Sequence, residues 1–349
     1  MAITYDGALG TTVNVFPRGS SVSVGFDSTV VLIGEDEGGE AESELPVFLA
    51  DQDEADDAFG EDSGLAAAYA AAAANGADDI YGVAVDENDW DGAAEAAMSV
   101  NPRYVYVDST EDANVNAVTG VVQSYATDLE FARVFAPTSE SISVEDITDY
   151  EPRDAHHRLV EVAPQQATVA GRDTYTAAAA VGHAARKPLA SSLAYDTVTV
   201  DSLGEEYRPS EATDFEQVTA VTKDATFVDG VTTSEEGAFE DIFQMEIVDT
   251  VAMGLDQVAQ DYAGSVVNTE DERDNLVSDM RIYLNSLADQ NPPLLADAFG
   301  GAPFSVQADV GADADAVDVT VGITPVDVMK QITINLNVGE VITFDGAEA

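Results

Sequence analysis

Residues 63–85 read SGLAAAYAAAAANGADDIYGVAV and hold a helix signal followed by a strand signal. Asp62 or Ser63 can cap a helix over 64–74, because a short side chain with an oxygen accepts a hydrogen bond from the first helical turn. An Asn-Gly pair then ends this helix. The apolar run 80–85 predicts a buried strand. A helix that leads directly into a buried strand is typical of α/β domains.

The same alternation of strand and helix continues on both sides of this stretch. Residues 29–34 (TVVLIG) form an apolar run that predicts a strand buried on both faces. Further strands are predicted at 104–107, 132–136 and 159–162, and helices over 90–98, 115–129 and 167–186. Short strands are expected at 198–200 and 225–228. Because parallel strands need crossover connections, this order predicts an α/β body with a largely parallel sheet.

The C-terminal third carries a different pattern, in which long helices precede alternating strands. Apolar residues recur at helical spacing over about 237–262 and again over 271–289. Apolar and polar residues then alternate over 317–323 and 332–338, with Pro325 between the two runs. That period of two predicts strands with one apolar and one polar face. We therefore expect a C-terminal domain of the α+β type.

Both ends of the chain are expected to be extended arms. Val13 and Val15 alternate with turn residues near the start, where no helical period is present. We divide the chain into an N-terminal arm (1–20), an α/β body (21–235), a C-terminal domain of two helices plus a strand (236–330) and a C-terminal strand with its tail (331–349). Unpaired strands seek partners, so such arms predict strand sharing between identical subunits.

Acidic residues far outnumber basic ones, with 67 Asp and Glu against 13 Lys and Arg and a formal net charge of −54. A field this negative excludes DNA or RNA as a non-specific partner, because phosphate binding needs a basic surface. At molar salt the Debye length is about 3 Å, so self-repulsion is screened. We interpret the charge as that of an extreme halophile. The alternative, binding of calcium or of a basic partner, predicts local acidic clusters, whereas here the acid is spread along the chain.

The sequence offers no active centre. It contains no cysteine, no Walker A loop, no G-x-G-x-x-G and no G-x-S-x-G. His156 and His157 are adjacent, so they would point apart in a strand and lie about 100° apart on a helix. An ordinary surface or capping role is therefore favoured over a metal or acid–base role. The acidic run from Asp51 fails as an EF-hand loop, because position 6 is Asp56 and position 12 is Asp62. We expect no catalytic, cofactor or metal site, although an enzyme without these motifs stays an alternative.

Several segments, taken in order, resemble the contractile tail sheath family of phages, pyocin-like particles and type VI secretion. Residues 29–34, 46–60 (PVFLADQDEADDAFG) and 63–85 resemble the family's succession of strand, Phe-Gly step, small-residue helix and strand. Residues 168–190 (TVAGRDTYTAAAAVGHAARKPLA) resemble the stretch that leads out of the family's α/β body.

The C-terminal segments are the most specific part of this resemblance. Residues 236–258, 275–291 and 317–338 follow the family's order of two helices and two alternating strands. One feature departs from the family pattern. The W-G-x-R-T stretch common in bacterial sheaths is not visible, and the nearest sequence is GVTT at 230–233.

The resemblance implies a structural subunit, without enzymatic activity or cofactor, that forms hexameric rings stacked around an inner tube. Contraction of the stack would drive the tube through a target envelope. The implied partners are the subunit itself, an inner tube protein, and baseplate and terminator proteins, with no nucleic acid and no membrane insertion. The start, MAITYDG, lacks the features of a signal peptide. We expect a virion tail, or a cytoplasmic or released contractile particle, of a high-salt organism. The alternative is another repetitive protein, a capsid or surface-layer subunit.

Two sets of assembly residues are predicted. Strand sharing between subunits is expected at the two arms, through Ile3, Tyr5, Val13, Val15, Ile332, Ile334, Leu336 and Val338. For the C-terminal strand, an ordinary edge strand within one subunit is the alternative. By family analogy alone, the C-terminal helices are expected to face the tube, through Glu240, Asp241, Gln244, Arg273 and Arg281.

Overall fold

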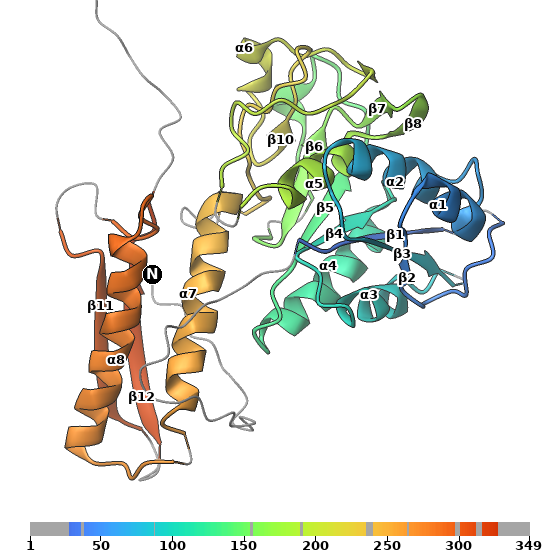
Figure 1. Cartoon of the computed structure of the whole chain (residues 1–349). Coiled ribbons are helices and arrows are strands. Elements are labelled where there is room, and N and C mark those ends of the chain that lie inside the picture. The colour runs from blue at the N-terminus through green and yellow to red at the C-terminus, as the bar shows by residue number, and fades with distance from the viewer. Residues whose placement is uncertain are drawn as a thin grey trace, which may run out of the picture.

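Figure 1 shows a computed structural model of the chain. It describes residues 28–35, 38–86, 88–153, 156–188, 191–234, 240–263, 265–296, 301–311 and 316–326. The helices are α1 (Gln52–Phe59), α2 (Gly64–Ala74), α3 (Trp90–Met98), α4 (Asp112–Ala126), α5 (Thr176–Ala185), α6 (Pro209–Ala212), α7 (Ile242–Gln260) and α8 (Glu270–Asp289). The strands are β1 (Val30–Glu35), β2 (Val47–Phe48), β3 (Ile80–Val85), β4 (Tyr104–Val107), β5 (Arg133–Pro137), β6 (Leu159–Ala163), β7 (Gln166–Val169), β8 (Arg172–Tyr175), β9 (Ser202–Leu203), β10 (Thr219–Ala220), β11 (Phe304–Val310) and β12 (Val317–Ile323).

The body is built on a seven-stranded sheet in the order β10-β6-β5-β4-β1-β3-β2. Its neighbouring strands are parallel, except that the short edge strand β2 runs antiparallel to β3. β1 lies between β3 and β4, and Val30 is opposite Ile80 of β3 on one side and Tyr104 of β4 on the other. The predicted α/β class with a largely parallel sheet is confirmed.

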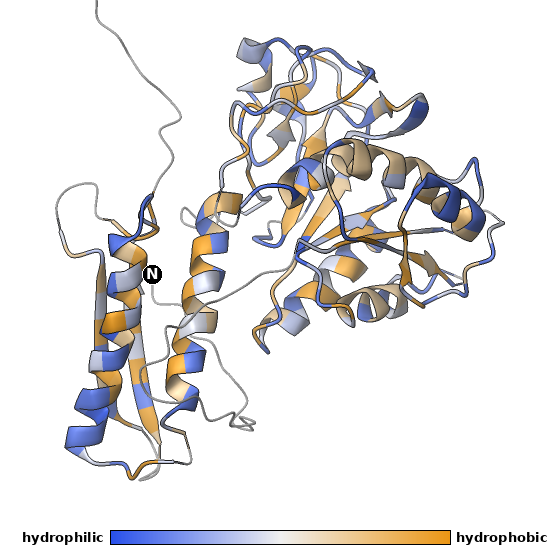
Figure 2. Ribbon diagram, viewed as in Figure 1, coloured by the Kyte–Doolittle hydropathy of each residue, from blue (hydrophilic) through white to orange (hydrophobic). Residues whose placement is uncertain are grey.

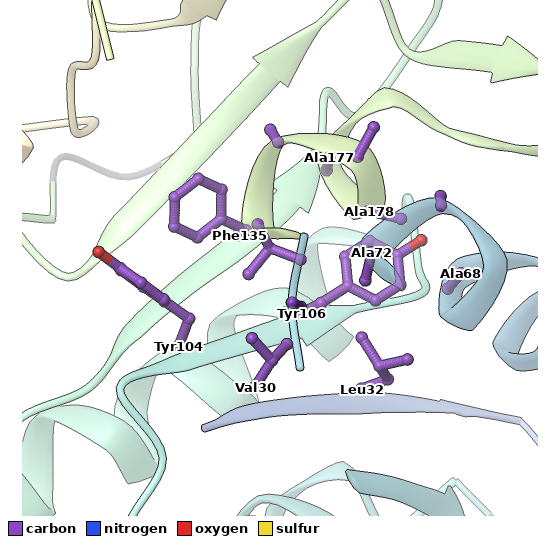
Figure 3. Packing of buried hydrophobic residues seen from close by; sticks show 14 of the residues in the cluster. Val30, Leu32, Ala68, Ala72, Tyr104, Tyr106, Phe135, Ala177 and Ala178 are labelled. Carbon is purple, nitrogen blue, oxygen red and sulfur yellow. The ribbon is translucent and has the colours of Figure 1, made fainter. Parts of the chain in front are cut away.

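Helices cover both faces of this sheet (Figure 1). On one face, Val30, Leu32 and Tyr106 pack against the alanine-rich helices α2 and α5 (Figure 3). On the other face, Val31 and Val105 pack with α3 and α4. The side chains of a strand alternate between the two faces, so strands that are apolar throughout are needed where helices cover both.

Small residues allow α2 and α5 to lie close together over the sheet. A Cβ added to Gly182 of α5 would lie 2.2 Å from the carbonyl oxygen of Ala72 in α2, so only glycine fits at this crossing. α2 is buried along most of its length, since it also contacts β7 and β8 of a second sheet. This explains why α2 is apolar on every side, where a surface helix would carry a polar face.

The predicted helix over 167–186 is wrong in its first half. Residues 166–175 form the antiparallel pair β7 and β8, which belongs to a three-stranded sheet in the order β8-β7-β9. Ala170 and Gly171 have φ values of 52° and 77°, the left-handed conformation of a tight turn. The chain therefore turns back on itself there, and the helix α5 begins only at Thr176.

Two long helices and a hairpin form a separate C-terminal unit, which is α7, α8, β11 and β12 (Figure 1). The helices are antiparallel, because Tyr283 bonds the carbonyl of Thr250 while Tyr262 bonds Asp279. One face of the hairpin, including Val306, packs on them. Apolar and polar stripes alternate around α7 and α8 in Figure 2, as expected for helices that are covered on one side only.

Other element predictions range from accurate to wrong. The predicted helices 64–74 and 90–98 and the strands 80–85, 104–107 and 317–323 are confirmed. Regular strands at 198–200 and 225–228 are wrong, because only the isolated bridges Thr197–Thr226 and Val221–Phe227 form there. Helix α1 and strand β11 were not anticipated.

Candidate functional site

Neither a metal-holding cluster nor a membrane-spanning helix is found in the part of the chain that the structure describes. Within that part, no group of three or more His, Asp or Glu side chains is placed to hold a metal ion. The acidic run that begins at Asp51 forms helix α1, and the Asp51 carboxylate accepts a hydrogen bond from the backbone N–H of Glu54. Among the described helices, none is long and apolar enough to cross a membrane.

The crevice in which doubly wound sheets bind ligands is filled by the chain itself. That crevice lies at the carboxyl ends of β1 and β4, because the chain runs from β1 toward β3 and from β4 toward β5, in opposite directions across the sheet. There, the Asp108 carboxylate accepts a 2.7 Å hydrogen bond from Tyr106. It also abuts the start of α2, since a Cβ on Gly64 would lie 1.9 Å from Asp108 Oδ2. A carboxylate at this helix start takes the place that a phosphate occupies in nucleotide-binding sheets.

The expectation that His156 and His157 point apart is wrong. They lie in a turn before β6, and their rings stack with centroids 5.1 Å apart and planes 13° apart. Burial, and then Arg158, lower the pKa of His157 to about 4. The pair is therefore uncharged at neutral pH and packs as two flat rings.

Helix α7 has two chemically different faces. Phe243, Ile247 and Val251 form an apolar stripe that packs in the core of the C-terminal unit. Glu246 and Asp249, three residues apart, project from another side and are 1% and 0% exposed. At 100° per residue, the centre of this carboxylate face lies about 130° around the helix from the centre of the apolar stripe. α7 thus faces the C-terminal unit with hydrocarbon, and it faces the body with these two carboxylates and with Ile242, which packs in the core of the body.

Three arginines of the body contact the acidic face of α7, and they lie at the amino ends of adjacent strands. Arg103 directly precedes β4, Arg133 begins β5 and Arg158 directly precedes β6. The backbone N–H of Arg133 donates to the carbonyl of Arg103, and that of Val134 donates to the carbonyl of Arg158. The three residues therefore stand side by side across the sheet. We call Arg103, Arg133 and Arg158 the arginine row.

Asp249 is held by two members of the arginine row. Arg158 makes a two-pronged contact, with Nη1 donating to Oδ2 at 2.6 Å and Nη2 donating to Oδ1 at 2.7 Å. Arg133 Nη2 donates to Oδ2 at 2.6 Å. Burial favours protonation of Asp249, but the two guanidinium groups outweigh it and hold the carboxyl pKa below its usual value. Asp249 is a buried anion with two cationic partners.

Glu246 is held by the third member of the row and by a tyrosine. Arg103 Nη2 donates to Glu246 Oε1 at 2.9 Å, and the Tyr104 hydroxyl donates to the same oxygen at 2.5 Å. Burial, followed by the nearby Glu246 charge, raises the pKa of Tyr104 well above its usual value, so the hydroxyl keeps its proton. Arg103 also donates to the carbonyl of Lys187 at 3.0 Å. Both buried carboxylates of α7, Glu246 and Asp249, are therefore bound from the body.

Sequence reasoning missed this junction, although a signal for it exists. The chain has only ten arginines, and three of them stand directly before or at the start of a predicted strand, in RYVYV, RVFAP and RLVEV. A charged residue repeated at the start of three neighbouring strands places the three charges side by side at the amino ends of those strands. The partners on α7 could not be inferred in this way, because Glu246 and Asp249 resemble the many other acidic residues of the chain.

The five predicted tube-facing residues do not form one cluster. Glu240 is exposed and Gln244 is partly buried, whereas Asp241 is buried and caps α7 by accepting from the N–H of Phe243 at 2.7 Å. In α8, Arg281 is exposed and donates to the carbonyl of Val306, and Arg273 donates to Asn268.

The two helices separate these residues in space. Because α7 and α8 are antiparallel, the first turn of α7 and the first turn of α8 lie at opposite ends of the unit (Figure 1). Glu240, Asp241 and Gln244 thus lie far from Arg273, and contact with a tube stays a prediction for each residue.

The hairpin offers strand edges for assembly. β11 and β12 pair along their whole length, from Phe304–Ile323 to Val310–Val317. Among the described residues this sheet has only these two strands, so each has one edge without a partner strand. The predicted strand residues Ile3, Tyr5, Val13, Val15, Ile332, Ile334, Leu336 and Val338 lie outside the described residues, as do the arms 1–20 and 331–349.

Comparison with known proteins connects this architecture to a family. No protein-family profile and no curated protein matches the sequence. Among solved structures, the chain is similar to one from the contracted sheath complex of an extracellular contractile injection system, PVC, with a TM-score of 0.69 and 13% identity over 94% of this chain and 98% of that chain. The chain has the fold of a contractile tail sheath protein. The expected resemblance to this family is confirmed at the level of the fold.

Two further structures show the same fold. One is from the anti-feeding prophage baseplate, with a TM-score of 0.67 and 11% identity over 95% of this chain and 99% of that chain. The other is the sheath tail protein from Desulfitobacterium hafniense, with a TM-score of 0.62 and 12% identity over 90% of this chain and 100% of that chain. These matches span both the body and the C-terminal unit.

Proposed function

We propose that this protein is the structural subunit of a contractile sheath. Subunits form hexameric rings that stack around an inner tube protein, and the stack contracts to drive the tube through a target envelope. Baseplate and terminator proteins close the two ends of the stack. The observation that carries this proposal is the likeness to sheath chains over nearly the whole length of both partners, 94% of this chain and 98% of the PVC sheath chain.

Features of the chain itself support this role. Among the described residues, no third strand pairs with the hairpin β11–β12, and strand addition at an open edge is a common way to join proteins. The arms 1–20 and 331–349 carry alternating apolar residues that suit such pairing. Contraction between two packings of one chain needs no nucleotide, which agrees with a switch-point crevice closed by Asp108.

The net charge of −54 supports a high-salt organism as the source of this sheath. A ring of six subunits would carry six times the net charge of −54, and only strong screening allows such bodies to pack closely. The sheath would act in a virion tail or in a particle released from the cell. Its inner tube would have to tolerate the same salt and meet a largely acidic subunit.

Electron microscopy of the full chain tests this function. The protein is expressed and kept in molar salt, then imaged in negative stain. Hollow sleeves of uniform width are the expected result. Flat lattices would instead indicate a surface-layer protein, and small separate particles at all concentrations would contradict a self-assembling sheath.

A further inference from the structure

We propose that Glu246 and Asp249 are positioning residues, which the arginine row uses to fix the direction in which the C-terminal unit leaves the body. This inference rests on the proposed sheath function for its consequence, because the angle between the two units would set the geometry of a sleeve. The contacts that carry it are present in the single chain.

The start of α7 is attached to the body by the backbone. Val231 and Asp241 form an isolated antiparallel bridge, and the N–H of Ile242 donates to the carbonyl of Gly230 at 3.1 Å. The Ile242 side chain also packs in the core of the body. Attachment at the first residues alone leaves the rest of a helix free to tilt. With 19 residues, α7 is about 28 Å long, so a tilt of about 10° at its start would move its far end by about 5 Å.

Side chains, and not close backbone packing, hold α7 against the body beyond this point. The backbone of α7 packs closely with α8, whereas long arginine side chains span the distance from the sheet edge to Glu246 and Asp249. These contacts lie one and two turns beyond the attachment at Asp241. Three separated contacts along one helix are enough to fix its direction.

The contacts are also directional. The guanidinium of Arg158 and the carboxylate of Asp249 meet as two parallel hydrogen bonds, a geometry that tolerates little rotation. Arg133 comes to the same carboxylate from the neighbouring strand. An apolar contact of equal area would permit small shifts of the helix, because the hydrophobic effect has no direction.

Stability alone is a weak explanation for this arrangement. Removing two charges from water costs several kcal/mol for each ion, and apolar replacements of buried ion networks are often neutral or stabilising. Three buried arginines also leave their Nε–H groups without hydrogen-bond partners. A junction shaped only for stability would use hydrocarbon here, as α7 does on its other face. The charges therefore serve position.

Pulsed electron spin resonance on the full chain tests this inference. The chain has no cysteine, so Asp53→Cys on α1 and Asn285→Cys on α8, both exposed in the native protein, give one labelled position in each unit. The test variant replaces the junction with hydrocarbon, as Arg133→Met, Arg158→Met and Asp249→Leu. The control variant removes a comparably buried ion pair inside the body, as Arg153→Met and Glu161→Leu.

The expected result is one narrow distance distribution for the parent and the control, and a distribution at least twofold broader for the junction variant. A narrow, unshifted distribution in a folded junction variant would overturn the proposal. Should that variant fail to fold by circular dichroism, Arg158→Lys decides. This change keeps the charge but loses the two-pronged contact, and an unchanged distribution there would equally overturn the proposal.

Imaging separates this inference from the proposed function. Absence of sleeves from the parent protein would count against the sheath role, while the spin-label distances would still report on the junction. If the parent forms sleeves, the junction variant is expected to form none, or sleeves of altered helical twist. Sleeves with parental twist would contradict the positioning role even if the sheath role holds.

Discussion

The two faces of α7 attach the helix to its neighbours in different ways, one by apolar contacts and the other by ionic contacts. Toward α8 and the hairpin, Phe243, Ile247 and Val251 bury hydrocarbon, and contact of this kind stabilises without specifying a direction. Toward the body, Glu246 and Asp249 meet the arginine row through charged hydrogen bonds of fixed geometry. One helix thus belongs to the core of the C-terminal unit by its apolar face, while its charged face fixes its direction relative to the body.

The charge distribution shows a second side of the same contrast. Acidic residues are spread along the chain, yet four of its ten arginines are buried with 2–6% exposure, at positions 103, 133, 153 and 158. Exposed charges are screened by salt, whereas buried pairs are screened much less. Salt should therefore act strongly on contacts between subunits and weakly on the junction inside each subunit.

Lowering the salt is expected to have the largest effect. When molar salt is dialysed to about 0.1 M, the Debye length rises from about 3 to about 10 Å, and repulsion between subunits of charge −54 is no longer screened. Sleeves should dissociate, followed by loss of the circular dichroism signal of the folded chain. Unchanged sleeves and spectra at low salt would refute this account of the charge.

Breaking the ionic face of α7 is expected to cost next most. Asp249→Asn leaves Arg133 and Arg158 buried without an anion, and loss of one partner from a buried pair costs about 3–5 kcal/mol in the free energy of unfolding. Denaturant titration in molar salt measures the cost. Asp256→Asn on the same helix is the matched control, because burial raises the pKa of Asp256 and no arginine offsets it. Equal stability of the two variants would show that the arginine contacts of Asp249 add nothing to the stability of the folded chain.

Truncation on the apolar side of the comparison is expected to cost slightly less. Leu284→Ala removes a fully buried side chain between α7, α8 and the hairpin, at a cost of about 2–5 kcal/mol. Its neighbour Ile282 is 64% exposed, so Ile282→Ala should change stability by less than about 0.5 kcal/mol. In spin-labelled protein, Leu284→Ala should leave the distance between the units narrow. Broadening equal to that of the junction variant would show that both faces aim the helix.

The smallest effect is expected from pH. His157 is neutral when folded, with a pKa of about 4 against about 6.5 when unfolded, so its contribution is complete above pH 6.5 and declines as the pH falls toward 4. The loss should not exceed about 1 kcal/mol per pH unit, because the ring is partly exposed to solvent. Melting temperatures between pH 7 and 5.5 should fall less steeply for His157→Gln. Parallel curves would rule out this role for His157.

Local signals explain which elements could be predicted from the sequence. Helix α2 has a Ser63 cap and an Asn-Gly end, and its predicted bounds match the structure. The alanines of 167–186 favour a helix over the whole stretch. The turn at Ala170–Gly171 instead makes its first half a pair of antiparallel strands. Helix α1 could not be predicted, because its acidic sequence QDEADDAF resembles a solvated loop. Only the structure shows that Phe59 is buried.

The junction lay beyond the reach of the sequence because its two halves are far apart in the chain. The arginines at 103, 133 and 158 meet carboxylates at 246 and 249, more than ninety positions away. Nothing local distinguishes Asp249 from the other acidic residues. Only the fold, which brings α7 across the amino ends of three strands, reveals which charges are paired.

Helical reconstruction of the sleeves by cryo-electron microscopy is the decisive test of the sheath role. We expect rings of six subunits, with α7, α8 and the hairpin lining the lumen and the seven-stranded sheet outside. The hairpin edges should pair with strands of neighbouring subunits, including residues 332–338. A helical assembly whose lumen is lined by the sheet body, or whose hairpin pairs with no neighbour, would contradict it.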